Sequence, residues 1–229
     1  MEIMQRSGPF LSLLLSLSSS LLIAATPDLS PGNSETVTGS AVIREMNIAR
    51  QNPALYAAFL EQVRQDYAAR GRLTGGIGLC THEGVPAVDE ATRFLRHTQP
   101  LPALALSPAV CLAAADHCRE QAGGAIGHHD GDGSDPGTRM RRYGVAAQAW
   151  AENIAYGQRS ARAIVMALII DDGIRSRGHR KNIFNRNYNV AGAAYGSHAR
   201  FGSVCSIDFA GGYGGSILAR AGSDVGNAF

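Results

Sequence analysis

The sequence has little excess charge, few aromatic residues and only one long apolar run. Its 21 lysines and arginines stand against 19 aspartates and glutamates, and the formal net charge is +2. A charge so close to zero gives no support to nucleic-acid binding. After the first residues no run qualifies as a transmembrane helix, and no internal repeat is visible. We therefore expect one globular domain with no transmembrane anchor, and 45% hydrophobic residues allow it a sizeable core.

The one long apolar run lies at the N-terminus and has the features of a secretion signal. Arg6 gives it a positive start, the stretch 10–24 is apolar apart from serines, and Ala25 is the expected last residue. No cysteine follows for lipid attachment, and no twin arginine precedes the run. We predict a secreted or periplasmic protein with a signal peptide at 1–25, a disordered leader at 26–39, a domain at 40–210 and a Gly-rich tail at 211–229.

Four cysteines fit an oxidising compartment but not a structural zinc site. Cys80, Cys111, Cys118 and Cys205 include no Cys-x-x-Cys pair. Cys111 and Cys118 lie on one predicted helix, roughly 10 Å apart along its axis, whereas a disulfide tolerates about 7 Å between Cα atoms. Each of these two is therefore expected to pair with Cys80 or Cys205, or to stay free.

Helical patterns occupy most of the domain, and strand patterns come late. The clearest helix has Ser107 as N-cap, Pro108 in its first turn and Gly123 after its end. Further helices are predicted over 42–49, 53–63, 86–97 and 161–172, with a helical turn around Arg139. Alternation predicts strands over 190–195 and 200–209, joined by a hairpin at 196–199. Helices first and strands late favour an α+β sandwich over a doubly wound sheet.

The loop 127–136 is the first of four segments that could carry chemistry. It holds His128 and His129 among three glycines and three aspartates. Its ordinary interpretation is a solvated turn in which the aspartates bind local backbone amides. A calcium loop is excluded by register, because the required glycine falls on Asp135 and the required glutamate on Arg141.

The other three segments each place a titratable group where local rules disfavour it. Glu152 is a lone acid in an apolar stretch, so it must be paired, ligating or protonated. Asp171 and Asp172 lie in the last turn of a predicted helix, where the macrodipole disfavours anions, unless nearby arginines neutralise them. His179 follows a glycine among basic residues, which is also compatible with a surface histidine or a helix cap.

The remaining histidines are not predicted to be site residues. His117 lies on the inward side of the predicted helix that starts after Ser107, and we interpret it as a hydrogen-bonded histidine at the edge of the core. His82, His97 and His198 belong to no constellation.

Taken together, the ordered blocks resemble the bacterial extracellular branch of the CAP (SCP/PR-1) superfamily, the cysteine-rich secretory protein family. The likeness covers about 41–210, and four blocks in order are a far stronger signal than any one of them. The blocks are Ser107-Pro108 with His117, Gly127-His128 with Asp132-Gly133-Ser134 and Arg142-Tyr143-Gly144, Ala151-Glu152-Asn153-Ile154-Ala155, and Ser176-Arg177-Gly178-His179-Arg180-Lys181-Asn182-Ile183.

The resemblance implies a three-layer α-β-α sandwich with a central cavity lined by two histidines and two acids. Carried over by position, these are His128, Glu152, Asp171 and His179. Asp171 departs from the family pattern, which has a glutamate there, and the alignment also admits Asp172 in its place. In the same way, His129 is the alternative to His128.

Two classes of function follow, and the resemblance favours the first. One is a secreted binding or signalling module, with a cavity able to hold zinc or another divalent cation through His128 and His179 and a neighbouring groove for a lipid, sterol or peptide. The alternative is a metal-dependent extracellular hydrolase in which Glu152 or Asp171 acts as the base. The chain lacks the His-Glu-x-x-His helix of many metalloproteases. A third possibility is an envelope-associated domain whose cavity is vestigial.

Overall fold

The structure is a computed structural model that describes residues 37–70 and 82–212. The predicted signal peptide, Cys80 and the chain beyond 212 lie outside the described residues. Within those residues, no helix is long and apolar enough to cross a membrane.

A four-stranded sheet forms the centre of the fold, with strand order β1-β3-β4-β2. Its strands are β1 (Ala105–Leu106), β2 (Ala149–Tyr156), β3 (Val190–His198) and β4 (Gly202–Gly211). Strands β3 and β4 form an antiparallel hairpin, β2 pairs antiparallel with the other side of β4, and β1 runs parallel to β3. Thus β2 is an edge strand, and β4 lies between two partners.

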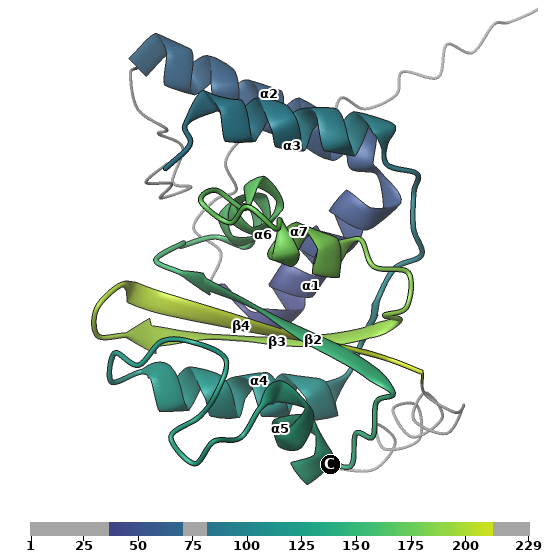
Figure 1. Cartoon of the computed structure of the whole chain (residues 1–229), viewed down its shortest axis with the longest axis vertical. Helices are drawn as coiled ribbons and strands as arrows, with labels where there is room; N and C mark the ends of the chain where they lie inside the picture. Colours follow the sequence, from purple (N-terminus) through teal and green to yellow (C-terminus); the bar gives the residue numbers. More distant parts are fainter. Residues whose placement is uncertain (1–36, 71–81, 213–229) are drawn as a thin grey trace, which may run out of the picture. The chain divides into compact units, whose positions relative to one another are not determined.

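Helices cover both faces of this sheet (Figure 1). On one face lie α4 (Pro108–Gln121) and α5 (Pro136–Arg142), and on the other lie α1 (Gly39–Gln51), α6 (Ala161–Ile170) and α7 (Gly178–Ile183). Helices α2 (Pro53–Arg70) and α3 (Val85–His97) pack against each other outside α1 and α6. The fold is therefore an α+β sandwich of three layers with an added helical pair.

The core follows from the alternation of the strands. Cys205, Ile207 and Phe209 of β4 join the large apolar cluster formed with α1 and α6, whereas Val204 and Ala210 pack on the α4 face. Helix starts follow local chemistry, because Ser107 and Ser160 accept hydrogen bonds from the amides of Val110 and Ala163 as N-caps. These two predicted starts are confirmed.

Three predicted features need correction. β2 was not predicted as a strand, because its half 152–155 is buried on both faces and shows no alternation of polar and apolar residues. The short helix α7 was not predicted as an element, although its residue His179 was a predicted site residue. The hairpin turn falls at 199–201 rather than 196–199, since β3 continues to His198.

The cysteines of the described residues are not joined by disulfides. Cys111, Cys118 and Cys205 are free. Alternation turns Cys205 toward α1 and α6, while Cys118 on α4 packs against the opposite face of the sheet. A bridge between Cys205 and a cysteine of α4 is therefore not formed, and the part of the prediction that involves Cys80 lies outside the described residues.

Candidate functional site

Adjacent residues of β2 point to opposite faces of the sheet, and this divides the predicted site. Glu152 faces α4 and α5, where it meets His117 and Arg139. Asn153 faces α7, where its amide donates to the backbone carbonyl of His179 at 2.9 Å. The four predicted residues form two hydrogen-bonded pairs.

The first pair is His128 and Glu152. Nδ1 of His128 lies 2.8 Å from Oε1 of Glu152, whose side chain is only 1% exposed. The other carboxylate oxygen of Glu152 accepts from Arg139 at 2.6 Å and from the hydroxyl of Ser206 at 2.8 Å. Glu152 is thus a buried, multiply hydrogen-bonded carboxylate, as its lone position in an apolar stretch predicted.

Arg139 holds the loop that carries His128. Its guanidinium is fully buried and donates to the backbone carbonyls of His128 and Ser134, both at 3.2 Å, and to the carboxylate of Asp130 at 3.3 Å. Because the same guanidinium also binds Glu152, one side chain from α5 fixes both members of the first pair. Sequence reasoning expected only a helical turn at Arg139.

His117 supports the same loop from α4. It is fully buried, with Nδ1 at 2.6 Å from Asp130 and Nε2 at 2.9 Å from the backbone carbonyl of Gly127. The interpretation of His117 as a hydrogen-bonded core histidine is confirmed. Asp132 and Asp135 bind the local amides of Ser134 and Thr138, as the turn interpretation predicted, but Asp130 is part of the buried network.

The second pair is Asp171 and His179. Oδ1 of Asp171 lies 2.7 Å from Nδ1 of His179, and Oδ2 accepts from the amides of His179 at 2.9 Å and Arg180 at 3.3 Å. Asp171 itself has a left-handed backbone, with φ 55°, and ends α6. Its carboxylate therefore serves the positive N-terminus of α7 rather than opposing the dipole of α6.

Asp172 has a different role from Asp171. Its carboxylate accepts from the amides of His82 and Glu83, just before α3. Glu83 in turn binds Arg177 at 2.7 Å and the amide of Gly173 at 2.8 Å. The Arg177 hydrogen bond and then that of Gly173 lower the pKa of Glu83 to about 2. Thus Arg177, one of the nearby arginines expected to neutralise the aspartates, directs its guanidinium to Glu83.

Two pockets flank β2, and each contains one of the pairs. A pocket of about 270 Å³ is lined by His128, His129, Trp150 and Glu152, among others. A larger pocket of about 500 Å³ contains Asp171 and His179. We call it the β2–α6 pocket, and its other lining residues include Ile154, Tyr156, Gln158, Leu168, Ile174, Phe201 and His82. His82, expected to belong to no constellation, therefore lines a pocket.

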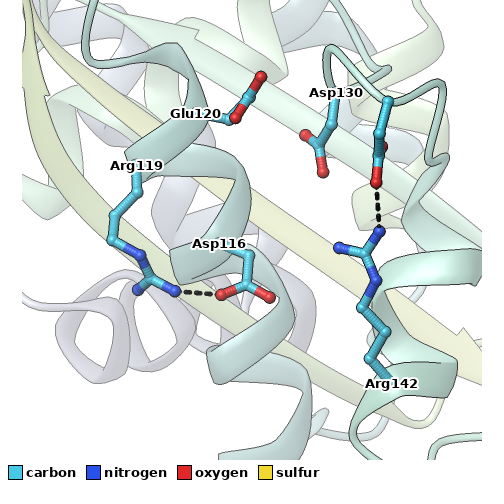
Figure 2. A pocket seen from close by; sticks show the side chains of 6 residues that line it. Asp116, Arg119, Glu120, Asp130 and Arg142 are labelled. Atoms are coloured by element: carbon cyan, nitrogen blue, oxygen red, sulfur yellow. Dashed lines mark hydrogen bonds and ion pairs between the residues drawn. The ribbon is translucent and has the colours of Figure 1, made fainter.

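A further hollow lies between α4, α5 and the loop that carries Asp130 (Figure 2). It is lined by Asp116, Arg119, Glu120, Asp130, Asp132 and Arg142. Asp116 pairs with Arg119, and Asp132 pairs with Arg142. Asp130 is already bound by His117 and Arg139, so most of the charge in this hollow is neutralised.

The two histidines of these pairs bear on the predicted divalent cation. Each imidazole directs Nδ1 to a carboxylate and leaves Nε2, which is how metal-binding histidines are commonly oriented. However, His128 and His179 line different pockets, and no group of three or more histidine, cysteine or acid side chains between 37 and 212, apart from the undescribed 71–81, could hold a metal ion. A divalent cation such as zinc therefore stays a prediction.

Several residues of the site were missed by sequence reasoning. Asn182 of α7 donates to the side-chain oxygen of Asn153 at 2.9 Å, so the two asparagines tie β2 to α7. Both asparagines belong to the motifs quoted above, but an asparagine side chain by itself does not indicate a particular function. Asp208 lies directly opposite Glu152 in the sheet, and its place in the predicted strand 200–209 indicated no role for it.

Fold and site together define a three-layer α+β sandwich in which two histidine–carboxylate pairs flank an edge strand. A protein of Bacillus subtilis (strain 168), "Uncharacterized protein YkwD", is 34% identical over 76 residues, which are 33% of this chain and 26% of that protein. The chain thus aligns with about a quarter of this relative. A model of the CAP family, the cysteine-rich secretory protein family, matches residues 90–209, more than half of the chain. The chain belongs to this family.

Solved structures with partial likeness come from bacterial extracellular and surface proteins. An extracellular protein containing an SCP domain from Bacillus anthracis has a TM-score of 0.42 and 23% identity, covering 53% of this chain and 37% of that one. An outer surface protein from Borrelia burgdorferi has a TM-score of 0.42 and 16% identity, covering 56% of this chain and 91% of that one.

Proposed function

We propose that this chain is a secreted binding module whose ligand occupies the β2–α6 pocket. The observation that carries the proposal is the composition of this pocket. Ile154, Leu168, Ile174 and Phe201 give it an apolar wall, and the Asp171–His179 pair gives it a polar end. Its volume of about 500 Å³ lies within the range of small-molecule sites, which is about 300–1,000 Å³.

Two large apolar side chains of this pocket are exposed in the free protein. Ile174 is 42% exposed and Phe201 40% exposed, on segments far apart in sequence. Apolar surface gathered around a concave site is a feature of ligand-binding grooves. A molecule with an apolar body and one polar group, such as a fatty acid, a sterol or an apolar peptide segment, matches this wall and its polar end.

The polar end is built to stay fixed when a ligand binds. The His179 ring is held through Nδ1 by Asp171, and its backbone carbonyl is held by Asn153. Pre-organised polar groups orient a ligand without a further ordering cost. The hydrolase alternative has less support, because the carboxylates of Glu152 and Asp171 are both buried and each already accepts three hydrogen bonds.

Binding of a fluorescent fatty acid and of a fluorescent sterol tests the proposal. We expect the double variant Ile174→Ser with Phe201→Ser to bind at least about tenfold more weakly, because burying such side chains contributes about 1.5–3 kcal/mol each. Leu112→Ser is the matched control, since Leu112 is 51% exposed on α4 and does not line the pocket. Equal binding by the double variant and the control would contradict the assignment of this pocket, as would the absence of binding to lipid, sterol and an apolar peptide library.

A further inference from the structure

Asp208 is a carboxyl group without a hydrogen-bond donor in the middle of the sheet. The residue is 0% exposed, and neither side-chain oxygen has a hydrogen-bond partner among the described residues. Burying an ionised carboxylate in this way is among the most costly arrangements in a protein. The position therefore requires an explanation that leaves the group uncharged or gives it a partner.

The sheet places a second carboxyl group directly beside Asp208. Glu152 is directly opposite on β2, so the two side chains start about 4.5–5.5 Å apart on the same face. On the other side, Gly192 of β3 has no side chain, and the backbone of α4 at Cys111 closes the space. Two carboxylates cannot hydrogen-bond to each other, but a carboxylic acid can donate to a carboxylate.

The charges around Asp208 favour the acid form. Burial is the first cause that raises the pKa of Asp208 well above its ordinary value, and the negative charge of Glu152 is the second. Arg139 of α5 opposes this shift, whereas the charge of Asp130 and the closeness of the Glu152 carboxyl group add to it. On α4, burial raises the pKa values of the Cys111 and Cys118 thiols, and the neighbouring Asp208 adds to this shift.

We propose that Asp208 is protonated in the folded protein at neutral pH and donates a hydrogen bond to the Glu152 carboxylate, which makes Asp208 a positioning residue for the Glu152–His128 pair. Arg139 and Ser206 already donate hydrogen bonds to the Glu152 carboxylate, and the protonated carboxyl group of Asp208 adds another donor that holds it in place. This leaves Oε1 aimed at Nδ1 of His128, so the imidazole keeps its proton on Nδ1 and presents Nε2 to the smaller pocket. The inference concerns this pair and does not depend on the ligand of the β2–α6 pocket.

Infrared spectroscopy on protein with ¹³C-carboxyl aspartate tests the protonation directly. We expect the wild-type chain at neutral pH to show a protonated-carboxyl band that shifts with the aspartate label and is missing in Asp208→Asn. The label distinguishes Asp208 from Glu152, because the band of a protonated Glu152 would not shift when only aspartate is labelled. Absence of a label-sensitive band at neutral pH overturns the proposal.

The nitrogen chemical shifts of His128 test the positioning role. Asparagine is a permanent neutral donor, so Asp208→Asn should keep the wild-type ratio of Nδ1–H to Nε2–H tautomers. Asp208→Leu fills the space without a donor, and we expect that ratio to fall about tenfold, the effect of one hydrogen bond to a charged group. Should the leucine variant not fold, Asp208→Ala removes the donor without adding volume. Wild-type tautomer ratios in the variants without a donor, or an equal fall in Asp208→Asn, would refute the positioning role.

Discussion

Replacing Arg139 with methionine is expected to destabilise this protein more than any change of an exposed charge. The side chain is fully buried, and its loss leaves the buried carboxylate of Glu152 without its cationic partner. Removing one member of a buried ion pair costs about 3–5 kcal/mol. For a chain of this size, about 2–4 °C in Tm corresponds to each kcal/mol, so we expect Tm to fall by roughly 6–20 °C.

Arg142 offers a matched control on the same short helix. It also pairs with an aspartate, Asp132, but their side chains are 42% and 60% exposed. Exposed pairs of this kind contribute about 0–1 kcal/mol, so Arg142→Met should change Tm by a few degrees at most. Urea denaturation and thermal melting at neutral pH measure both variants.

A double-mutant cycle identifies the cause of the loss. Glu152→Gln removes the negative charge that Arg139 compensates, so combining it with Arg139→Met should cost less than the sum of the two single changes. Equal stability of Arg139→Met and Arg142→Met, or strict additivity in the cycle, would show that the buried pair is not what Arg139 stabilises.

Two further outcomes follow from the sheet. Because the pKa of Asp208 is raised on folding, the folded chain binds a proton that the unfolded chain releases above about pH 4, so stability relative to Asp208→Asn should fall by up to about 1.4 kcal/mol per pH unit as pH rises toward the raised pKa. Parallel urea-denaturation profiles for both proteins between about pH 4 and pH 7 would contradict this. Gly192→Ala should destabilise the fold by roughly 1–3 kcal/mol, because its Cβ would lie 2.3 Å from the amide nitrogen of Cys111. Gly196→Ala, whose nearest contact is 3.7 Å, should leave thermal unfolding almost unchanged, and equal losses in the two variants would argue against close packing of α4 on β3.

The sequence predicts the parts of this fold that local chemistry determines. Ser107 and Ser160 mark helix starts because a hydroxyl N-cap satisfies free amides wherever the rest of the chain lies. β2 escaped prediction because its buried half carries Glu152 and Asn153 side by side, and each polar side chain finds its partners only through distant segments. Long-range pairing of this kind leaves no periodic signal in the strand itself.

The candidate site was predicted as a set of residues but not as an arrangement. The resemblance to CAP proteins identified His128, Glu152, Asp171 and His179, and each histidine does meet an acid. It did not show which acid each histidine meets, Glu152 for His128 and Asp171 for His179. Arg139 was hidden among three arginines of one short helix, and nothing in the spacing shows which of them is buried.

Asp171 acts at the end of one helix and at the start of the next, and this limits where residues can be inserted into the chain. One residue closes α6 with its backbone and opens α7 with its carboxylate, so the connection between the two helices has a fixed span. Each inserted residue can lengthen the chain by up to about 3.8 Å. The donor–acceptor distance of a hydrogen bond varies by much less than this, so the bonds from Asp171 to α7 would break. An affinity tag or reporter loop placed at 172–177 would therefore separate the amide and imidazole of His179 from the Asp171 carboxylate.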